Sequence, residues 1–278
     1  MLLQIGVRMF SVADFCNKEL ETEPYIIKPE LLPVRGKLYI AAPEKHNKSF
    51  ALLSMGFALA SAQPLWSVPD FTIARRFRVG YFDQELGSIR LQKRLRSIRN
   101  LKPADEIRDT SFFVEPRNRA FRLDKKEGLL AIEALALEHG LEVLLFDPIS
   151  KFYPGFDENN TQQMSQLVLA LDTLIDRTGT SLVFAHHMPK PSEVARHGAQ
   201  RMRGSTVLAA DLDTYIEFKR LSPGHHKSQY IEASFTTRDA PVEPVYLKRL
   251  PSGEFDFAGR DNPLSRRFHP HTTPDYEV

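Results

Sequence analysis

The chain has 278 residues, of which 42% are hydrophobic and 26% are charged, and it carries a formal net charge of +2 and one cysteine, Cys16. This length can bury one large core, whereas the single cysteine excludes an intrachain disulfide framework and the small net charge gives no argument for a polycationic nucleic-acid-binding protein. No apolar run reaches the length of a membrane-spanning helix, and the N-terminus does not show a secretory signal pattern, so we expect a cytoplasmic protein with no membrane partner.

Residues 1–35 are mixed in composition and punctuated by proline, and we expect them to form an N-terminal extension. The next stretch, Lys37–Ala42, is an apolar run typical of a buried strand, and a polar turn follows it. Lys48 and Ser49 then open an apolar helical pattern. This layout is typical of a phosphate-binding loop, in which backbone N–H groups hold phosphate oxygens, the lysine neutralises phosphate charge and the hydroxyl binds Mg²⁺.

The loop departs from the usual phosphate-binding pattern, because Ala42 and Asn47 stand where that pattern has glycine. Asparagine is the non-glycine residue that best tolerates a left-handed backbone, so Asn47 can still form the turn. Glu44 adds a carboxylate that would repel phosphates. An ordinary strand–helix turn with a surface lysine fits this stretch equally well, so the rest of the chain has to decide between the two interpretations.

Strands and helices alternate along the chain as far as residue 185. The expected strands after the first are residues 77–83, 111–114, 143–147, 181–185, 213–218, 230–235, 244–247 and 253–257, and the expected helices are residues 48–62, 88–99, 123–139, 161–177 and 204–210. This order predicts an α/β fold with a mostly parallel central sheet flanked by helices and with antiparallel C-terminal strands. We expect one domain over residues 36–258 and a flexible tail over residues 259–278.

Polar side chains follow the expected strands at their carboxyl ends, where ligands bind in sheets of this kind. The loop after the first strand, Glu85, Asp147 and the pair His186 and His187 all fall at such positions. Asp147 follows a fully apolar strand, which is the way a single carboxylate is delivered to Mg²⁺. The sequence therefore predicts one site at this edge of the sheet.

The motifs, in this order, resemble those of the RecA-like P-loop NTPase superfamily and, within it, the plasmid- and phage-encoded RepA-type helicases and their DnaB-like relatives. The resemblance covers about residues 25–250 and rests on the stretches Ala42–Ser49, Phe82–Gly87, Leu141–Pro148 and Ser181–Lys190. It implies a RecA-like fold, ATP and Mg²⁺ as cofactors, and a homo-oligomer such as a hexamer. It also implies single-stranded DNA or another nucleic acid as the partner.

The same resemblance implies roles for individual residues near the nucleotide. The binding loop would comprise Ala42, Pro43, Glu44, Lys45, His46, Asn47, Lys48 and Ser49. Lys48 would contact the β- and γ-phosphates, and Ser49 and Asp147 would bind Mg²⁺. Glu85 would be the general base that orients and deprotonates the attacking water. His186, with His187 beside it, would sense the γ-phosphate.

Two further groups of residues would act at subunit and nucleic-acid contacts. Arg238 matches the position of an arginine finger that completes the site of the neighbouring subunit, but the lysine that relatives carry two residues earlier is Thr236 here. The loop over residues 188–203 would follow nucleic acid with its basic side chains, which are Lys190, Arg196, Arg201 and Arg203. The basic helix over residues 88–99 would be a second nucleic-acid surface or a subunit contact.

These observations favour an ATP-dependent motor, either an oligomeric replicative DNA helicase or a related DNA-processing ATPase of a mobile element. The missing glycines and Glu44 leave open a nucleotide-sensing or catalytically inactive nucleic-acid-binding module of the same fold. A metal hydrolase built on Asp147, His186 and His187 is a third hypothesis, which needs further ligands. For Glu85 and Arg238 the plainer alternative is an exposed surface charge, and for Asp147 it is a turn cap.

Overall fold

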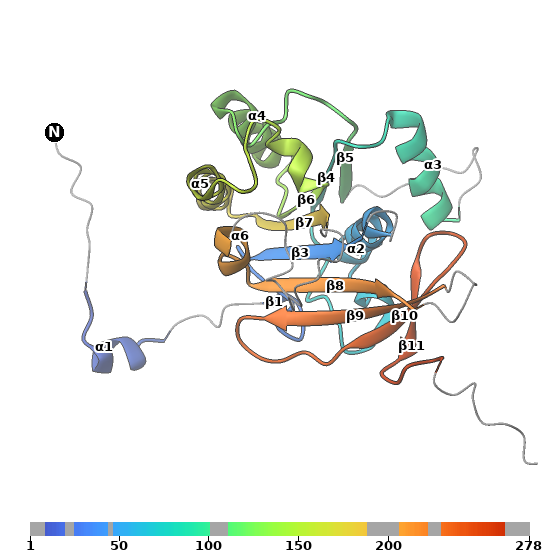
Figure 1. Cartoon of the computed structure of the whole chain (residues 1–278). Helices are drawn as coiled ribbons and strands as arrows, with labels where there is room; N and C mark the ends of the chain where they lie inside the picture. Colours follow the sequence, from blue (N-terminus) through green and yellow to red (C-terminus); the bar gives the residue numbers. More distant parts are fainter. Residues whose placement is uncertain are drawn as a thin grey trace, which may run out of the picture.

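The structure is a computed structural model of the chain, and it describes residues 9–19, 25–43, 47–100, 111–187, 206–221 and 229–264. Its centre is a nine-stranded sheet in the order β11-β10-β9-β8-β3-β7-β6-β4-β5 (Figure 1). The strands are β3 (Lys37–Ala42), β4 (Val79–Asp83), β5 (Phe112–Glu115), β6 (Val143–Asp147), β7 (Ser181–His187), β8 (Thr214–Arg220), β9 (Tyr230–Thr237), β10 (Val245–Arg249) and β11 (Phe255–Gly259).

The strands from β8 to β5 in that order run parallel, whereas β9, β10 and β11 each pair antiparallel with their neighbours. Every residue of β3, β4 and β6 is buried, as expected for parallel strands that are covered on both faces. Because parallel strands end together, the carboxyl ends of β3, β7, β6 and β4 meet at one edge. The expected sheet, with its antiparallel C-terminal strands, is confirmed.

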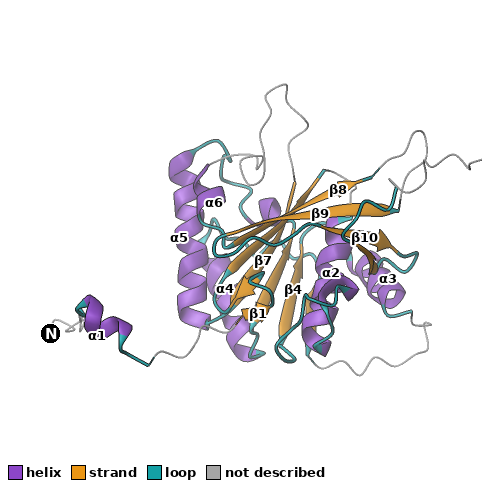
Figure 2. Ribbon diagram, turned by 90° about the horizontal axis from the view of Figure 1, so that it is seen from below, coloured by secondary structure: helices purple, strands orange, loops and turns teal. Residues whose placement is uncertain are grey.

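Helices cover both faces of the sheet (Figure 2). On one face lie α2 (Lys48–Ser61) and α3 (Ser88–Ile98), and on the other lie α4 (Lys126–Glu138), α5 (Thr161–Thr178) and α6 (Thr206–Ala210). Two short 3₁₀ segments, η1 (Leu65–Ser67) and η2 (Ile149–Phe152), follow α2 and β6. None of the described helices is long and apolar enough to cross a membrane.

Alternate residues of each central strand enter different cores. In β3, Leu38 and Ile40 pack in the core beneath α2, whereas Tyr39 packs in the core beneath α4 and α5. In β7, Val183 belongs to the first core and Phe184 to the second. This alternation follows from the two-residue period of a strand. It also determines the face of the sheet toward which the side chain at the end of each strand points.

The N-terminal part of the chain divides into two pieces. Helix α1 (Val12–Cys16) buries none of its residues and lies apart from the sheet (Figure 1). By contrast, β1 (Tyr25–Ile27) pairs with β2 (Leu32–Pro33), and Ile27 and Leu31 are fully buried in the core beneath α2. Part of the segment expected to be an extension therefore packs as part of the body.

Candidate nucleotide-binding site

The loop that leaves β3 is organised by Asn47 and Lys48. Asn47 has φ 70° and ψ 14°, so it adopts the left-handed conformation that the sequence predicted for it. The Lys48 ammonium donates to the carbonyl oxygens of Ala42 at 2.7 Å and Pro43 at 3.0 Å, which holds it inside the loop. The Asn47 side chain makes no capping hydrogen bond, so it leaves the first backbone N–H groups of α2 to other partners, for which an anion is suited.

Three of the predicted loop residues, Glu44, Lys45 and His46, lie outside the described residues. The structure therefore describes the two ends of this loop, which are residues 42–43 and 47–49. Ala42 is fully buried as the last residue of β3, and Pro43 follows it with its carbonyl oxygen on Lys48.

The structure brings together the two predicted metal ligands. Asp147 is the last residue of β6 and is 1% exposed. Its carboxylate accepts a hydrogen bond from the Tyr81 hydroxyl at 2.5 Å and another from the Ser49 side chain. Burial raises the pKa of the Asp147 carboxyl above its ordinary value, and these two hydrogen bonds oppose that rise only in part.

A second carboxylate, Asp83, lies beside Asp147, and the sequence did not single it out. The two residues end neighbouring strands and pair in register, and Asp83 is also 1% exposed. Its Oδ1 atom accepts from the backbone N–H groups of Glu85 at 3.1 Å and Leu86 at 3.0 Å. Burial, together with the nearby negative charges of Asp147 and Glu85, raises the pKa of Asp83 to about 6.

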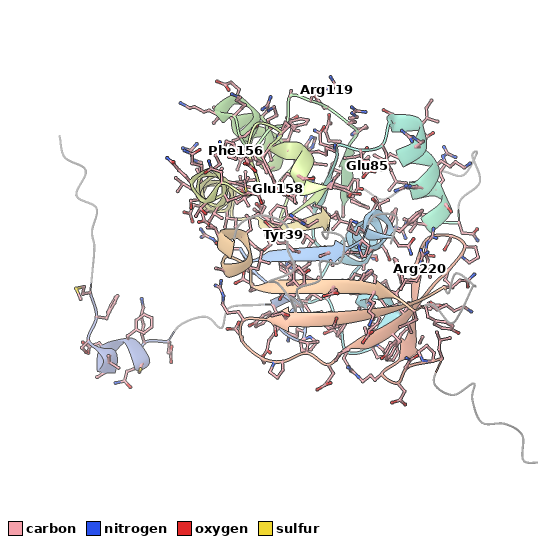
Figure 3. The ribbon with its side chains drawn as sticks, viewed as in Figure 1. Tyr39, Glu85, Arg119, Phe156, Glu158 and Arg220 are labelled. Carbon is pink, nitrogen blue, oxygen red and sulfur yellow. The ribbon has the colours of Figure 1, made fainter. Side chains whose placement is uncertain are left out.

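Glu85 reaches the same edge of the sheet from the turn after β4. It is exposed, and its charge contributes to the raised pKa values of both Asp83 and Asp147. In Figure 3, Glu85 and Arg220 both lie toward the edge at which β3 and β8 end. An exposed carboxylate near two buried ones suits a group that handles water rather than one that binds a cation directly.

Arginines gather around Phe50, which follows Ser49 in the first turn of α2. The guanidinium groups of Arg94 on α3 and Arg249 at the end of β10 lie 4.8 Å and 4.4 Å from the centre of the Phe50 ring. The positive charge of Arg94 opposes the rise in the pKa of Asp147. Burial, together with the positive charges of Arg220 and Arg94, lowers the pKa of Arg249, so these cations lie close together. They would offset charge on an anionic ligand.

The charged residues of the basic helix α3 do not all face solvent. Arg94 lies over the Phe50 ring of α2, as described above. The guanidinium group of Arg99 lies 4.4 Å from the centre of the Phe57 ring, which also belongs to α2. Ile89 is 85% exposed, whereas Leu91 and Ile98 of the same helix are buried. Leu91, Leu95 and Ile98 form the apolar side of α3, and the cation–π contacts add to its interface with α2.

His186 does not join the predicted site. Its ring lies near that of Tyr39, with 6.3 Å between the ring centres, and it is 2% exposed. Tyr39 packs beneath α4 and α5, on the face of the sheet opposite to α2. Because strand residues alternate between faces, the His186 ring points away from the Lys48 side. His187, the last residue of β7, pairs in the sheet with Ala42, the last residue of β3.

Arg238 lies at the opposite edge of the sheet from the loop of its own chain. It follows β9, and its backbone N–H donates to the Asp213 carbonyl oxygen at 2.9 Å. The backbone N–H of Asp213 in turn donates to the carbonyl oxygen of Lys37, at the start of β3. The Arg238 guanidinium pairs with the Asp213 carboxylate at 3.1 Å and remains 54% exposed. It therefore cannot act on a nucleotide at the loop of its own chain.

A family model described as AAA domain matches residues 6–193, which include the loop after β3 and the ends of β4, β6 and β7. The chain belongs to the AAA domain family. No curated protein sequence matches it significantly. The predicted nucleic-acid contacts Lys190, Arg196, Arg201 and Arg203 lie outside the described residues of this AAA domain.

The AAA domain also resembles a solved structure, that of a KaiC-like protein from the hyperthermophilic archaeon Pyrococcus horikoshii OT3. The similarity covers 84% of this chain and 93% of the other, with a TM-score of 0.58 and 8% sequence identity. The RecA-like fold class expected from the sequence is confirmed. The comparisons do not single out the narrower group of RepA-type and DnaB-like helicases.

The oxygen atoms at this edge of the AAA domain fit Mg²⁺, which prefers oxygen ligands and is usually bound through one or two carboxylates, water and substrate phosphates. Ser49 and Asp147 supply such oxygens in contact with one another. Among the described residues, no three or more His, Cys, Asp or Glu side chains are grouped to hold a metal. A cation here would therefore depend on the ligands of the nucleotide as well as on the protein.

Proposed function

We propose that the chain is a Mg²⁺-dependent ATPase whose nucleotide lies between the loop after β3 and the ends of β6 and β4. The observation that carries this proposal is the contact between the Ser49 side chain and Asp147, beside an N-terminus of α2 that the Asn47 side chain does not cap. A hydroxyl at a helix start and a buried carboxylate at the end of a different strand meet where phosphate and Mg²⁺ would be held together.

Each described residue has a defined task in this proposal. Lys48 lies inside the loop, where its ammonium would offset the charge of the β- and γ-phosphates. Ser49 and Asp147 would hold the Mg²⁺, which when bound neutralises charge on the phosphate oxygens. Glu85 would orient the attacking water and accept its proton, since it is exposed and close in space to Asp147.

We propose further that the ATPase acts as a homo-oligomer, with a hexamer as the expected form. Arg238 and the loop occupy opposite edges of the sheet, so a head-to-tail contact between copies would bring Arg238 of one copy to the loop of the next. Such heterologous contacts give a ring when the rotation between neighbouring copies closes. In the isolated chain the Arg238 guanidinium pairs with Asp213, and this ion pair would have to open when a neighbour binds.

The nucleic-acid part of the proposal depends on the resemblance to RepA-type helicases. A motor that processes single-stranded DNA, either a replicative helicase or a related DNA-processing ATPase, would use the basic loop over residues 188–203. A catalytically inactive nucleotide sensor of the same fold is the alternative. The loop favours that alternative to the extent that Ala42 and Asn47 replace its glycines.

One experiment separates these functions. ATP binding and Mg²⁺-dependent hydrolysis, with and without single-stranded DNA, would be measured for the wild type, Lys48→Ala and Glu85→Gln. Lys126→Ala is the matched control, because Lys126 is an exposed lysine that also opens a helix, α4. We expect DNA-stimulated hydrolysis that both site variants abolish and the control retains. Binding without hydrolysis in the wild type would support the sensor, and hydrolysis that persists in both site variants would refute the ATPase site.

A further inference from the structure

Asp83 has a carboxylate oxygen that the proposed function does not use. The side chain is 1% exposed, and only its Oδ1 atom is engaged, by the backbone N–H groups of Glu85 and Leu86. The Oδ2 atom is buried and has no hydrogen-bond partner among the described residues. A buried carboxylate oxygen without a partner is costly, so it needs a physical explanation.

The capping role of Asp83 does not require a carboxylate. An asparagine at this position would present the same Oδ1 acceptor to the two N–H groups of the turn, and it would carry no charge. What distinguishes aspartate from asparagine here is the second oxygen, which is the atom without a partner. The charge of Asp83 therefore serves something other than the local turn.

The unpartnered oxygen lies beside the predicted cation site. Asp83 and Asp147 end adjacent parallel strands and pair in register, so their side chains leave the same face of the sheet. Tyr81, two residues before Asp83 on that face, donates to the Asp147 carboxylate at 2.5 Å. Adjacent strands lie about 4.8 Å apart, so two buried carboxylates that pair in register are within reach of one divalent cation.

We propose that Asp83 is a second carboxylate of the divalent-cation site, acting together with Asp147 and Ser49. This inference rests on the proposed function in one respect, namely that the cation held there serves the bound nucleotide. Mg²⁺ retains several waters and is held through one or two carboxylates, so Asp83 binds the cation directly or through one of its waters. Either arrangement gives the Oδ2 atom the partner that it lacks.

The test is Mn²⁺ binding to the full chain, followed by electron paramagnetic resonance, first without nucleotide and then with ADP. Asp83→Asn keeps the Oδ1 acceptor and removes the charge. Glu115→Gln is the matched control, because Glu115 ends the neighbouring strand β5 at the same edge and accepts from Asn118 through its Oε1 atom. We expect Asp83→Asn to weaken Mn²⁺ binding at least about 10-fold, and the control to change it less than about two-fold.

A second measurement guards against a purely structural effect. In EDTA at pH 7.5, Asp83→Asn should melt at a higher temperature than the wild type, because it removes one of two mutually repelling buried charges. Unchanged Mn²⁺ affinity in Asp83→Asn, equal weakening by Glu115→Gln, or no Mn²⁺ binding by the wild type in either condition would each overturn the proposal. So would an Asp83→Asn protein that is less stable in EDTA or does not fold. Hydrolysis is not measured, so the proposed ATPase activity can fail independently of this result.

Discussion

The Tyr81 hydroxyl donates a hydrogen bond to Asp147 Oδ2 at 2.5 Å, and both residues are fully enclosed by the sheet and α2. Tyr81 is on β4 and Asp147 is on β6, so this bond fixes one strand-end carboxylate from the neighbouring strand. The Asp147 carboxylate therefore has one donor from the sheet, Tyr81, and one from α2, Ser49.

Replacing this tyrosine tests how far the carboxylate depends on it. Tyr81→Phe should lower the free energy of unfolding by about 1–3 kcal/mol, because a buried carboxylate then loses a hydrogen bond and nothing replaces it. Urea denaturation followed by circular dichroism measures this. Tyr246→Phe is the control, on a partly exposed tyrosine of β10. Equal stability changes in the two variants would contradict the structural importance of the Tyr81–Asp147 bond.

The left-handed conformation of Asn47 gives a second prediction. Asn47→Gly should leave the free energy of unfolding unchanged or raise it slightly, since glycine adopts φ 70° without steric cost. Asn47→Val should lower it by about 1–2 kcal/mol, because a β-branched side chain clashes with the backbone at positive φ. Thermal denaturation of the two variants decides this. A valine variant as stable as the glycine variant would show that the loop does not need this conformation.

The position of Arg238 predicts that it acts on ATP hydrolysis at the site of a neighbouring copy. Arg238→Ala should reduce ATP hydrolysis at least about 100-fold, as the loss of an arginine finger does, while ATP binding changes little. Mixing it with an excess of Glu85→Gln protein should restore part of the activity, because each variant supplies what the other lacks. Light scattering with and without nucleotide measures assembly. A protein that stays monomeric in every condition while it hydrolyses ATP would exclude the finger.

The raised pKa of Asp83 predicts a pH dependence of stability in the absence of metal. Its value of about 6 in the folded chain exceeds the value of 3.8 for an unperturbed aspartate, so the folded state binds the proton more tightly than the unfolded state does. The stabilisation of the folded state by this proton is therefore complete below pH 4 and is lost as the pH rises through 6. The free energy of unfolding should fall by up to about 2 kcal/mol over this range. In EDTA, the difference in stability between Asp83→Asn and the wild type should grow over this range. A constant difference from pH 4 to pH 7 would show that Asp83 does not titrate there.

Much of the site could be predicted because topology alone brings its parts together. Lys48 and Ser49 start the helix after β3, and Asp147 ends β6, so any parallel sheet with these strands near its centre places them at one edge. The left-handed backbone at Asn47 could be predicted from its position before Lys48 and from the backbone preferences of asparagine.

Other features depend on packing that a pattern of residues does not determine. The face of the sheet that the His186 side chain takes depends on the register of β7, which is fixed by the packing of Val183 beneath α2 and of Phe184 beneath α4 and α5. Arg94 lies over Phe50 across the interface between α3 and α2, and the spacing of charges along α3 does not indicate this contact. Asp83 is an ordinary acid after a strand in the sequence, and only its burial beside Asp147 distinguishes it.

The loop that holds Lys48 and the Asp213–Arg238 ion pair lie at opposite edges of the same sheet. In the proposed ring, every copy would supply Arg238 to the loop of one neighbour and receive Arg238 from the other neighbour. The activity of each copy would then depend on the copy that precedes it around the ring. A copy defective only at Arg238 would silence the next copy around the ring while its own pocket stays competent. In a mixed assembly the fraction of silent sites would therefore equal the fraction of defective chains, and each silent site would lie in the neighbour of a defective copy.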